Sequence, residues 1–248
     1  NSLVKIDMSE YTERFSLSRL IGAPPGYIGY DEGGELTEKV RRNPYSVVLF
    51  DEIEKGHSDL YNILLQVFDE GVLTDGLGRK VDFRNSIVIM TSNMGARDLK
   101  NNGFGFGSSK YDLEYQKMKE KILGHVKNTF SPELVNRIDD SIVFHQLSES
   151  NVYDIIDLQI TDLIDNLSKL GLKFRLNKSA KKYIASRGYD PRYGVRLLRR
   201  EIQKNLEDPI SELLLKNSFK KGTMISVKMI KGKISFDIKQ VKKVNKSI

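Results

Sequence analysis

The chain has 248 residues, of which 39% are hydrophobic, enough to bury one core or one core plus a small satellite domain. It has no cysteine, which excludes disulfides and thiolate metal sites, and no apolar run approaches the roughly 20 residues that span a bilayer. The net charge of +7 suggests nucleic-acid binding, but residues 216–248 hold ten lysines and one acid, so the rest of the chain is slightly acidic. We therefore expect a solvated basic tail at residues 241–248, and neither a nucleic-acid nor a membrane partner.

The first two thirds of the chain alternate short β-rich runs with helical patterns, which predicts a parallel α/β sheet. The apolar runs at 47–50 and 87–90 are unbroken, as in strands that are covered on both faces. The predicted strands are Leu3–Asp7, Ser46–Asp51, Ser86–Thr91 and Ser141–Phe144.

Helical patterns lie between these strands. Ser58 is expected to cap a helix that ends at Gly71. Between Tyr115 and Phe130 an apolar residue recurs every three or four positions, which predicts a helix with one apolar face. Ser131, followed by a proline and an acid, is typical of the N-cap of a further short helix.

The character of the sequence changes near Leu147. Ser148 is expected to cap one long amphipathic helix that Gly171 closes. We therefore predict a large subdomain over residues 1–146 and a small α+β domain over residues 147–240. The remaining elements predicted for the small domain are helices at 178–186, 194–206 and 209–216, and strands at Phe174–Leu176, Met224–Ile230 and Lys233–Ile238.

Asp51 and Glu52 follow a buried strand, so both carboxylates should reach the carboxyl edge of the sheet, where α/β proteins bind ligands. This is the Walker B arrangement, in which the first acid holds Mg²⁺ through water and the second orients the attacking water. The same two residues also suit an ordinary helix start, so the pair by itself leaves both readings open.

Three further polar residues fit phosphate chemistry. Asn93, after the next strand, can hold a γ-phosphate or the attacking water, although Ser-Asn in this position is also common in turns. Arg137 and Arg196 can stabilise charge on a transferring phosphoryl group, although most arginines form surface ion pairs.

The segment Gly26-Tyr27-Ile28-Gly29 places an aromatic residue between glycines. Glycine on both sides makes the backbone mobile, which does not suit packing in a core. Two readings are open: a tight turn with Tyr27 folded down, or an aromatic ring displayed so that it grips a ligand.

Together these motifs resemble the Clp ATPases, and the resemblance covers nearly the whole chain. The matching stretches resemble the second ATPase domain of ClpB and ClpC. They are Ser18–Glu38, Asn43–Lys55, Ile63–Gln66, Arg79–Phe83, Ile89–Gly95 and Asn136–Asp139.

The resemblance implies an AAA+ fold, ATP and Mg²⁺ as cofactors, a homo-hexamer, and client polypeptides as substrates. It implies that Asp51 and Glu52 form Walker B, that Asn93 is sensor 1, and that Arg137 is an arginine finger acting on a neighbouring subunit. It further implies that Arg196 is sensor 2 and that Tyr27, flanked by Gly26, Ile28 and Gly29, is the pore-loop aromatic. The Walker A pattern G-x-x-x-x-G-K-[ST] does not occur, so we expect the chain to be a segment of a longer protein and inactive alone.

The stretch around Phe104-Gly105-Phe106 bears on the subfamily. ClpC, ClpA and ClpX carry an aliphatic-Gly-Phe loop that docks into the ClpP peptidase, and ClpB lacks it. An aromatic stands here where an aliphatic residue is usual. The resemblance therefore favours a ClpC-like unfoldase that feeds ClpP, with a ClpB-like disaggregase as the alternative. A nucleotide-dead interaction module and a nucleic-acid-processing AAA+ protein are further alternatives.

Overall fold

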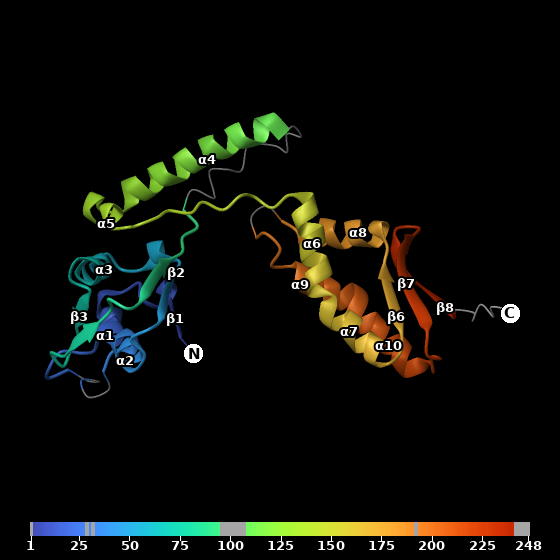
Figure 1. The fold of residues 1–248 in the computed structure, drawn as a ribbon, viewed down its shortest axis with the longest axis horizontal. Coiled ribbons are helices and arrows are strands. Elements are labelled where there is room, and N and C mark those ends of the chain that lie inside the picture. Colours follow the sequence, from blue (N-terminus) through green and yellow to red (C-terminus); the bar gives the residue numbers. More distant parts are fainter. Residues whose placement is uncertain (1, 28–29, 31–32, 95–107, 191–192, 241–248) are drawn as a thin grey trace, which may run out of the picture. The chain divides into compact units, whose positions relative to one another are not determined.

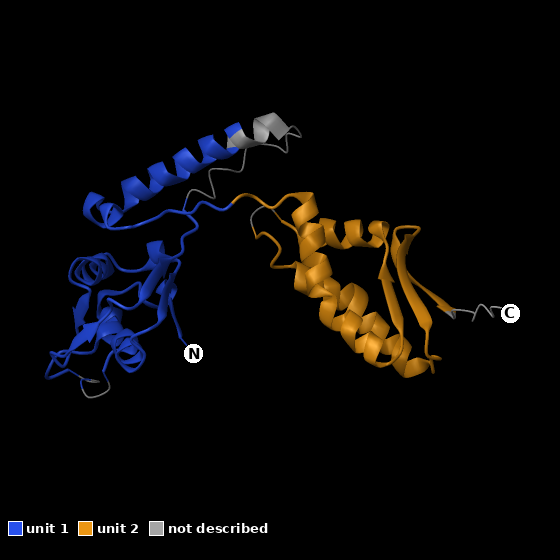
Figure 2. Ribbon diagram, viewed as in Figure 1, with its two compact units in different colours: residues 1–144 blue, residues 145–248 orange. Residues whose placement is uncertain are grey.

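The computed structural model describes residues 2–27, 30, 33–94, 108–190 and 193–240. The chain divides into two compact units, residues 1–144 and residues 145–248 (Figure 2). None of the helices in the described part is both long and apolar enough to cross a membrane.

The first unit is built on a parallel sheet of three strands in the order β1-β2-β5 (Figure 1). The strands are β1 (Leu3–Asp7), β2 (Val47–Asp51) and β5 (Ile87–Met90), and they confirm three of the predicted strands. The register sets Asp51 opposite Asp7, so the acids that end β1 and β2 share the carboxyl edge of the sheet.

The two faces of this sheet differ. Val48 and Phe50 point into the core and are fully covered, together with apolar residues of α2 and α3. On the opposite face Leu3, Ile87 and Ile89 are 58%, 63% and 44% exposed. The prediction that these strands are covered on both faces is therefore wrong for the described residues, because the second face leaves these three apolar side chains exposed.

The helices predicted in this unit are present, but one cap differs. Ser58 makes no capping bond; the Asp59 N–H donates to Nδ1 of His57 instead, at 3.2 Å. Gly71 ends that helix with a left-handed φ of 66°, and Ser131 caps α5 as predicted. The helices are η1 (Met8–Glu10), η2 (Arg14–Ser16), α1 (Leu17–Ile21), α2 (Glu35–Arg42), η4 (Ile53–Lys55), α3 (Asp59–Glu70), α4 (Ser108–Thr129) and α5 (Pro132–Asn136).

Two segments of the first unit differ from the predicted strands. An antiparallel hairpin, β3 (Val72–Thr74) and β4 (Lys80–Asp82), connects α3 to β5 and was not predicted. The predicted strand at Ser141–Phe144 is absent, since these residues form no ladder. The Tyr115 hydroxyl donates to the Val143 carbonyl at 2.8 Å, so a side chain replaces the strand partner.

The second unit has a sheet of three strands in the order β6-β7-β8, with its helices to one side (Figure 1). β6 (Lys173–Leu176) is parallel to β7 (Thr223–Ile230), and β8 (Lys233–Gln240) is antiparallel to β7, which confirms the predicted strands. Ile225 and Val227 are fully buried against helical side chains.

The helices of the second unit depart from prediction at three points. The helix predicted over 194–206 begins only at Leu198, because residues 194–197 form a bridge and turns. The long helix bends at Ile160, whose ψ of 1° divides it into α6 (Glu149–Gln159) and α7 (Thr161–Lys169). The predicted helices at 194–206 and 209–216 run together through a π turn (Gln203–Glu207), because Pro209 has no N–H to continue the regular ladder. The π turn joins α9 (Leu198–Ile202) to α10 (Asp208–Lys216), and α8 (Lys178–Gly188) is the remaining predicted helix.

Candidate functional site

The carboxyl edge of the first sheet gathers Asp51, Glu52 and Asn93. Thr91, which follows β5, joins them: its hydroxyl donates to Oδ1 of Asp51 at 2.5 Å and accepts the Glu52 N–H at 3.2 Å. The amide of Asn93 donates to Oε1 of Glu52 at 3.4 Å. The structure thus brings together the three residues that the sequence predicted at this edge, and Thr91 is a further member that the analysis missed.

Glu52 has an unusual backbone. Its φ of 55° and ψ of 52° are left-handed, a region that a residue with a long side chain rarely occupies. Such a conformation costs energy and persists only where the surroundings enforce it, most often at functional sites. Here the hydroxyl of Thr91 accepts the Glu52 N–H and the carbonyl of Thr91 accepts the Ile53 N–H at 3.0 Å, so β5 holds the turn.

Two lysines pair with the acids. The Lys5 ammonium lies 2.7 Å from Oδ2 of Asp51, and the Lys55 ammonium pairs with Oε2 of Glu52. Hydrogen bonding to Asp51 and to Glu52 raises the pKa of Lys5 and of Lys55, respectively. Both lysines are about half exposed, so these are surface pairs that another cation can displace.

The donor set at this edge suits a hard cation held partly by phosphate. Asp51 supplies a carboxylate and Thr91 a hydroxyl, and Mg²⁺ takes one or two carboxylates together with water and phosphate oxygens. Within the described ranges no three His, Cys, Asp or Glu residues group closely enough to hold a metal ion by themselves. An all-protein metal cage therefore does not fit these residues, whereas Asp51 acting through water does.

Glu54 is a second residue that the sequence analysis missed. Its Oε1 accepts the Asn93 N–H at 3.3 Å, while its Oε2 is buried without a hydrogen-bond partner. Glu54 thereby fixes the backbone of the residue whose side chain meets Glu52. The signal in the sequence was the third acid of the run Asp-Glu-Ile-Glu, which a purely local reading assigns to a helix start.

The two predicted arginines lie elsewhere. Arg137 follows α5, is half exposed, and pairs through Nε with Asp69 in the last turn of α3 at 2.7 Å. Arg196 belongs to the second unit, where it is exposed in the loop before α9. Gly194, with a φ of 61°, shapes that loop.

The loop between α1 and α2 carries the predicted aromatic. Tyr27 is 70% exposed, so it is displayed rather than folded onto the core. Its N–H donates to the Pro24 carbonyl at 3.2 Å, and Gly26 has a φ of 89°. Ile28 and Gly29 lie outside the described residues, as does the candidate docking segment Phe104-Gly105-Phe106.

Comparison with known proteins agrees with this architecture. Residues 1–141 match the family model described as AAA domain (Cdc48 subfamily), and residues 147–227 match the C-terminal, D2-small domain, of ClpB protein. The chain is 51% identical over 228 residues to the chaperone protein ClpB of Oceanobacillus iheyensis, an alignment that covers 92% of this chain and 28% of that protein. It is 48% identical over 239 residues to the ATP-dependent Clp protease ATP-binding subunit ClpC of Staphylococcus aureus strain USA300, covering 96% of this chain and 29% of that protein.

The chain therefore spans less than a third of the length of these relatives. The first unit matches an AAA domain, and the second unit matches the small domain of a second ATPase domain. The chain belongs to the AAA family of ATPases, as the second-ATPase-domain region of a Clp ATPase.

Proposed function

We propose that the protein containing this chain is an ATP-driven unfoldase that threads client polypeptides through a homo-hexameric ring. The observation that carries the proposal is the contact of Asn93 with Glu52 beside Asp51 at the sheet edge. The exposed ring of Tyr27 in the same unit supplies the surface that grips the client.

The residues at the edge divide the work of hydrolysis. Asp51 would hold Mg²⁺ through water, and the ion would supply positive charge to the phosphate oxygens. Glu52 accepts a proton from, or polarises, the attacking water. Asn93 keeps the Glu52 carboxylate oriented, and Glu54 holds Asn93 in place through its backbone N–H.

The two arginines complete the proposal. We assign Arg137 the role of arginine finger for a neighbouring subunit and Arg196 the role of sensor 2 within its own subunit. The ion pair with Asp69 supports this role of Arg137, because it keeps the guanidinium at the surface of the unit, half exposed. A guanidinium that acts on another subunit has to be accessible there.

We propose further that the protein resembles ClpC in feeding a ClpP peptidase. This finer proposal rests on the sequence of Phe104-Gly105-Phe106, with Phe106 as the ring that enters a pocket on ClpP. The alternative is a ClpB-like disaggregase, since the chain is similar to ClpB and to ClpC alike. Co-sedimentation of the full-length protein with ClpP, with and without Phe106→Ala, distinguishes the two: equal binding by both proteins would favour the disaggregase.

The direct test of threading is Tyr27→Ala in the full-length protein. Removing the ring leaves an alanine directly after Gly26, with no aromatic face to grip a backbone of arbitrary sequence. We expect client unfolding to be lost while ATP consumption continues, as measured with a folded fluorescent client and a coupled phosphate assay. Phe15→Ala is the matched control, because Phe15 is a 74% exposed aromatic of the same unit outside the loop. Unfolding at the wild-type rate by Tyr27→Ala would reassign Tyr27 to another role.

A further inference from the structure

The base of the Tyr27 loop is in direct backbone contact with the tip of the β3–β4 hairpin. The Gly76 N–H donates to the Ile21 carbonyl at 2.9 Å. A Cβ added to Gly76 would lie 2.5 Å from the Ala23 carbonyl oxygen, and one added to Gly34 would lie 2.3 Å from the Ile21 carbonyl carbon. The two ends of the loop and the hairpin tip therefore approach so closely that only glycine fits at both places.

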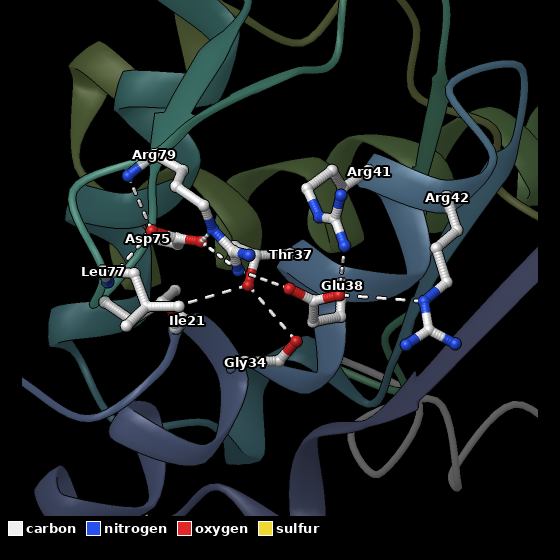
Figure 3. Close-up of polar contacts among 9 residues, drawn as sticks. All are labelled: Ile21, Gly34, Thr37, Glu38, Arg41, Arg42, Asp75, Leu77 and Arg79. Atoms are coloured by element: carbon white, nitrogen blue, oxygen red, sulfur yellow. Dashed lines mark hydrogen bonds and ion pairs between the residues drawn. The ribbon is translucent and has the colours of Figure 1, made fainter. Parts of the chain in front are cut away.

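A polar network reinforces this contact (Figure 3). Arg79, at the end of the hairpin turn, donates through Nη2 to Oε1 of Glu38 and through Nε to Oδ2 of Asp75 at 2.7 Å. The side chain of Asp75 is 1% exposed, and its Oδ1 accepts the N–H groups of Leu77 and Arg79 at 3.0 and 2.8 Å. Asp75 thus locks the turn, and the planar guanidinium of Arg79 links that turn to α2.

Glu38 is the receiving side of the link. It lies in the first turn of α2, directly after the loop returns to the core. Its Oε2 accepts a hydrogen bond from Nη2 of Arg41 at 2.9 Å, and Nε of Arg42 lies 3.7 Å from the same oxygen. The guanidinium groups of Arg41 and Arg79 lower the pKa of Glu38 to about 2. This carboxylate is therefore charged at any working pH.

The hairpin occupies a particular place in the chain. It follows α3, which begins shortly after Glu52, and it leads into β5, which ends shortly before Asn93. The hairpin is therefore part of the covalent connection between Glu52 and Asn93, beside the direct pairing of β2 with β5. The contact of Arg79 with Glu38 joins the same segment to the Tyr27 loop.

We propose that Arg79 is a positioning residue that couples the Tyr27 loop to the segment between Glu52 and Asn93. Through Glu38 and Asp75 it makes the base of the loop and the hairpin move as one body. This role rests on the proposed function, because it gives the loop a motion to perform. The structural part, a braced loop base, stands on contacts that can be measured without ATP or client.

The test uses the full-length protein with Glu38→Gln, which keeps the shape of the side chain and removes the charge that Arg79 binds. Arg41→Gln is the matched control, since it removes the other strong partner of Glu38 and leaves the hairpin link intact. The first readout is amide hydrogen exchange at Gly76 and Gly22, whose N–H groups are bonded at the base of the loop. We expect Glu38→Gln to speed this exchange about tenfold, as the loss of one charge-assisted hydrogen bond predicts. Arg41→Gln should leave it unchanged.

The second readout is the amount of client unfolded per ATP hydrolysed. We expect this ratio to fall severalfold in Glu38→Gln and to stay at the wild-type value in Arg41→Gln. Arg79→Lys is a second severing variant, because one ammonium cannot replace the two bridging nitrogens of Arg79. It should behave as Glu38→Gln does. Because the two substitutions break the same contact from opposite sides, the test still stands if one of the two proteins fails to fold.

Two outcomes overturn the inference. If both severing variants match Arg41→Gln in exchange, the network does not brace the loop. If exchange rises but the ratio of client to ATP is unchanged, the brace is structural and does not couple. The Tyr27→Ala protein separates these results from a failure of the proposed function. If the proposed function is wrong, the Tyr27→Ala protein still unfolds clients; if only the coupling by Arg79 is wrong, it does not. The hydrogen-exchange result does not depend on whether the proposed function is right.

Discussion

The first unit holds two clusters of carboxylates that are built differently. At the sheet edge, Asp51 and Glu52 have side chains 31% and 30% exposed, and lysines on long stems pair with them. Beneath the Tyr27 loop, the side chains of Glu38 and Asp75 are 19% and 1% exposed. Their partners are guanidinium groups and backbone N–H groups.

The difference separates a site that exchanges ligands from one that holds a shape. An ammonium on a flexible stem is a point charge that a nucleotide-bound cation can displace, whereas a guanidinium held by two carboxylates fixes distance and direction. Removing one partner of a covered carboxylate also costs more stability, because the remaining charge is then unpaired and water does not reach it. The variants below test this contrast, beginning with the largest expected effect.

Glu52→Gln in the full-length protein should lower ATP hydrolysis by about 10²–10⁴-fold, the usual contribution of a positioned general base. The amide keeps the shape of the side chain but cannot take a proton from water, so ATP binding should persist. Phosphate release and nucleotide binding, measured side by side, check this. Glu70→Gln, at the exposed end of α3, is the control. Turnover near the wild-type rate would remove Glu52 from the chemistry.

Asp75→Asn should lower the free energy of unfolding of the first unit by about 2 kcal/mol, because a covered charged hydrogen-bonded pair is broken on one side. Asp82→Asn is the matched control in the same hairpin, since Asp82 is 41% exposed and pairs with Arg84. Chemical denaturation of the full-length protein, monitored through hydrogen exchange of the amides in this unit, measures the effect of both substitutions. Equal effects would mean that the cluster under the loop is no stronger than a surface pair.

The contribution of Glu38 should have a defined pH range. Its pKa is lowered from 4.5 to about 2 in the folded protein, so the folded state binds its proton less well than the unfolded state. The stabilisation is therefore complete above about pH 5 and is lost as the pH falls through 4 towards 2. The stability difference between wild type and Glu38→Gln, measured from pH 7 to 3, should be constant at first and then shrink. A difference that already declines between pH 7 and 6 would contradict this assignment.

Lys5→Gln should have the smallest effect. Lys5 is 54% exposed, and its pair with Asp51 is a surface contact that water and salt replace. The thermal midpoint should match that of the wild type, while Asp75→Asn lowers it by several degrees. A loss comparable to that of Asp75→Asn would show that the edge cluster is as firmly built as the network beneath the loop.

Much of the molecule could be predicted from the sequence. The unbroken apolar runs of β2 and β5 specify strands because β-branched and aromatic residues suit a pleated surface. Asp51 and Glu52 at the end of such a run must reach the carboxyl edge in a parallel sheet. Gly71 predicts the end of α3, since a left-handed residue closes a helix most readily when it is glycine.

Other features were decided only by tertiary structure. The strands of the β3–β4 hairpin have three residues each, too short for an alternating pattern to be recognised. The segment Ser141–Phe144 has strand-like composition, yet a strand exists only where another backbone offers a ladder. The link from Glu38 to Arg79 joins residues 41 positions apart. Local propensity carries no information on such a pair, because its geometry depends on how α2 and the hairpin pack on one core.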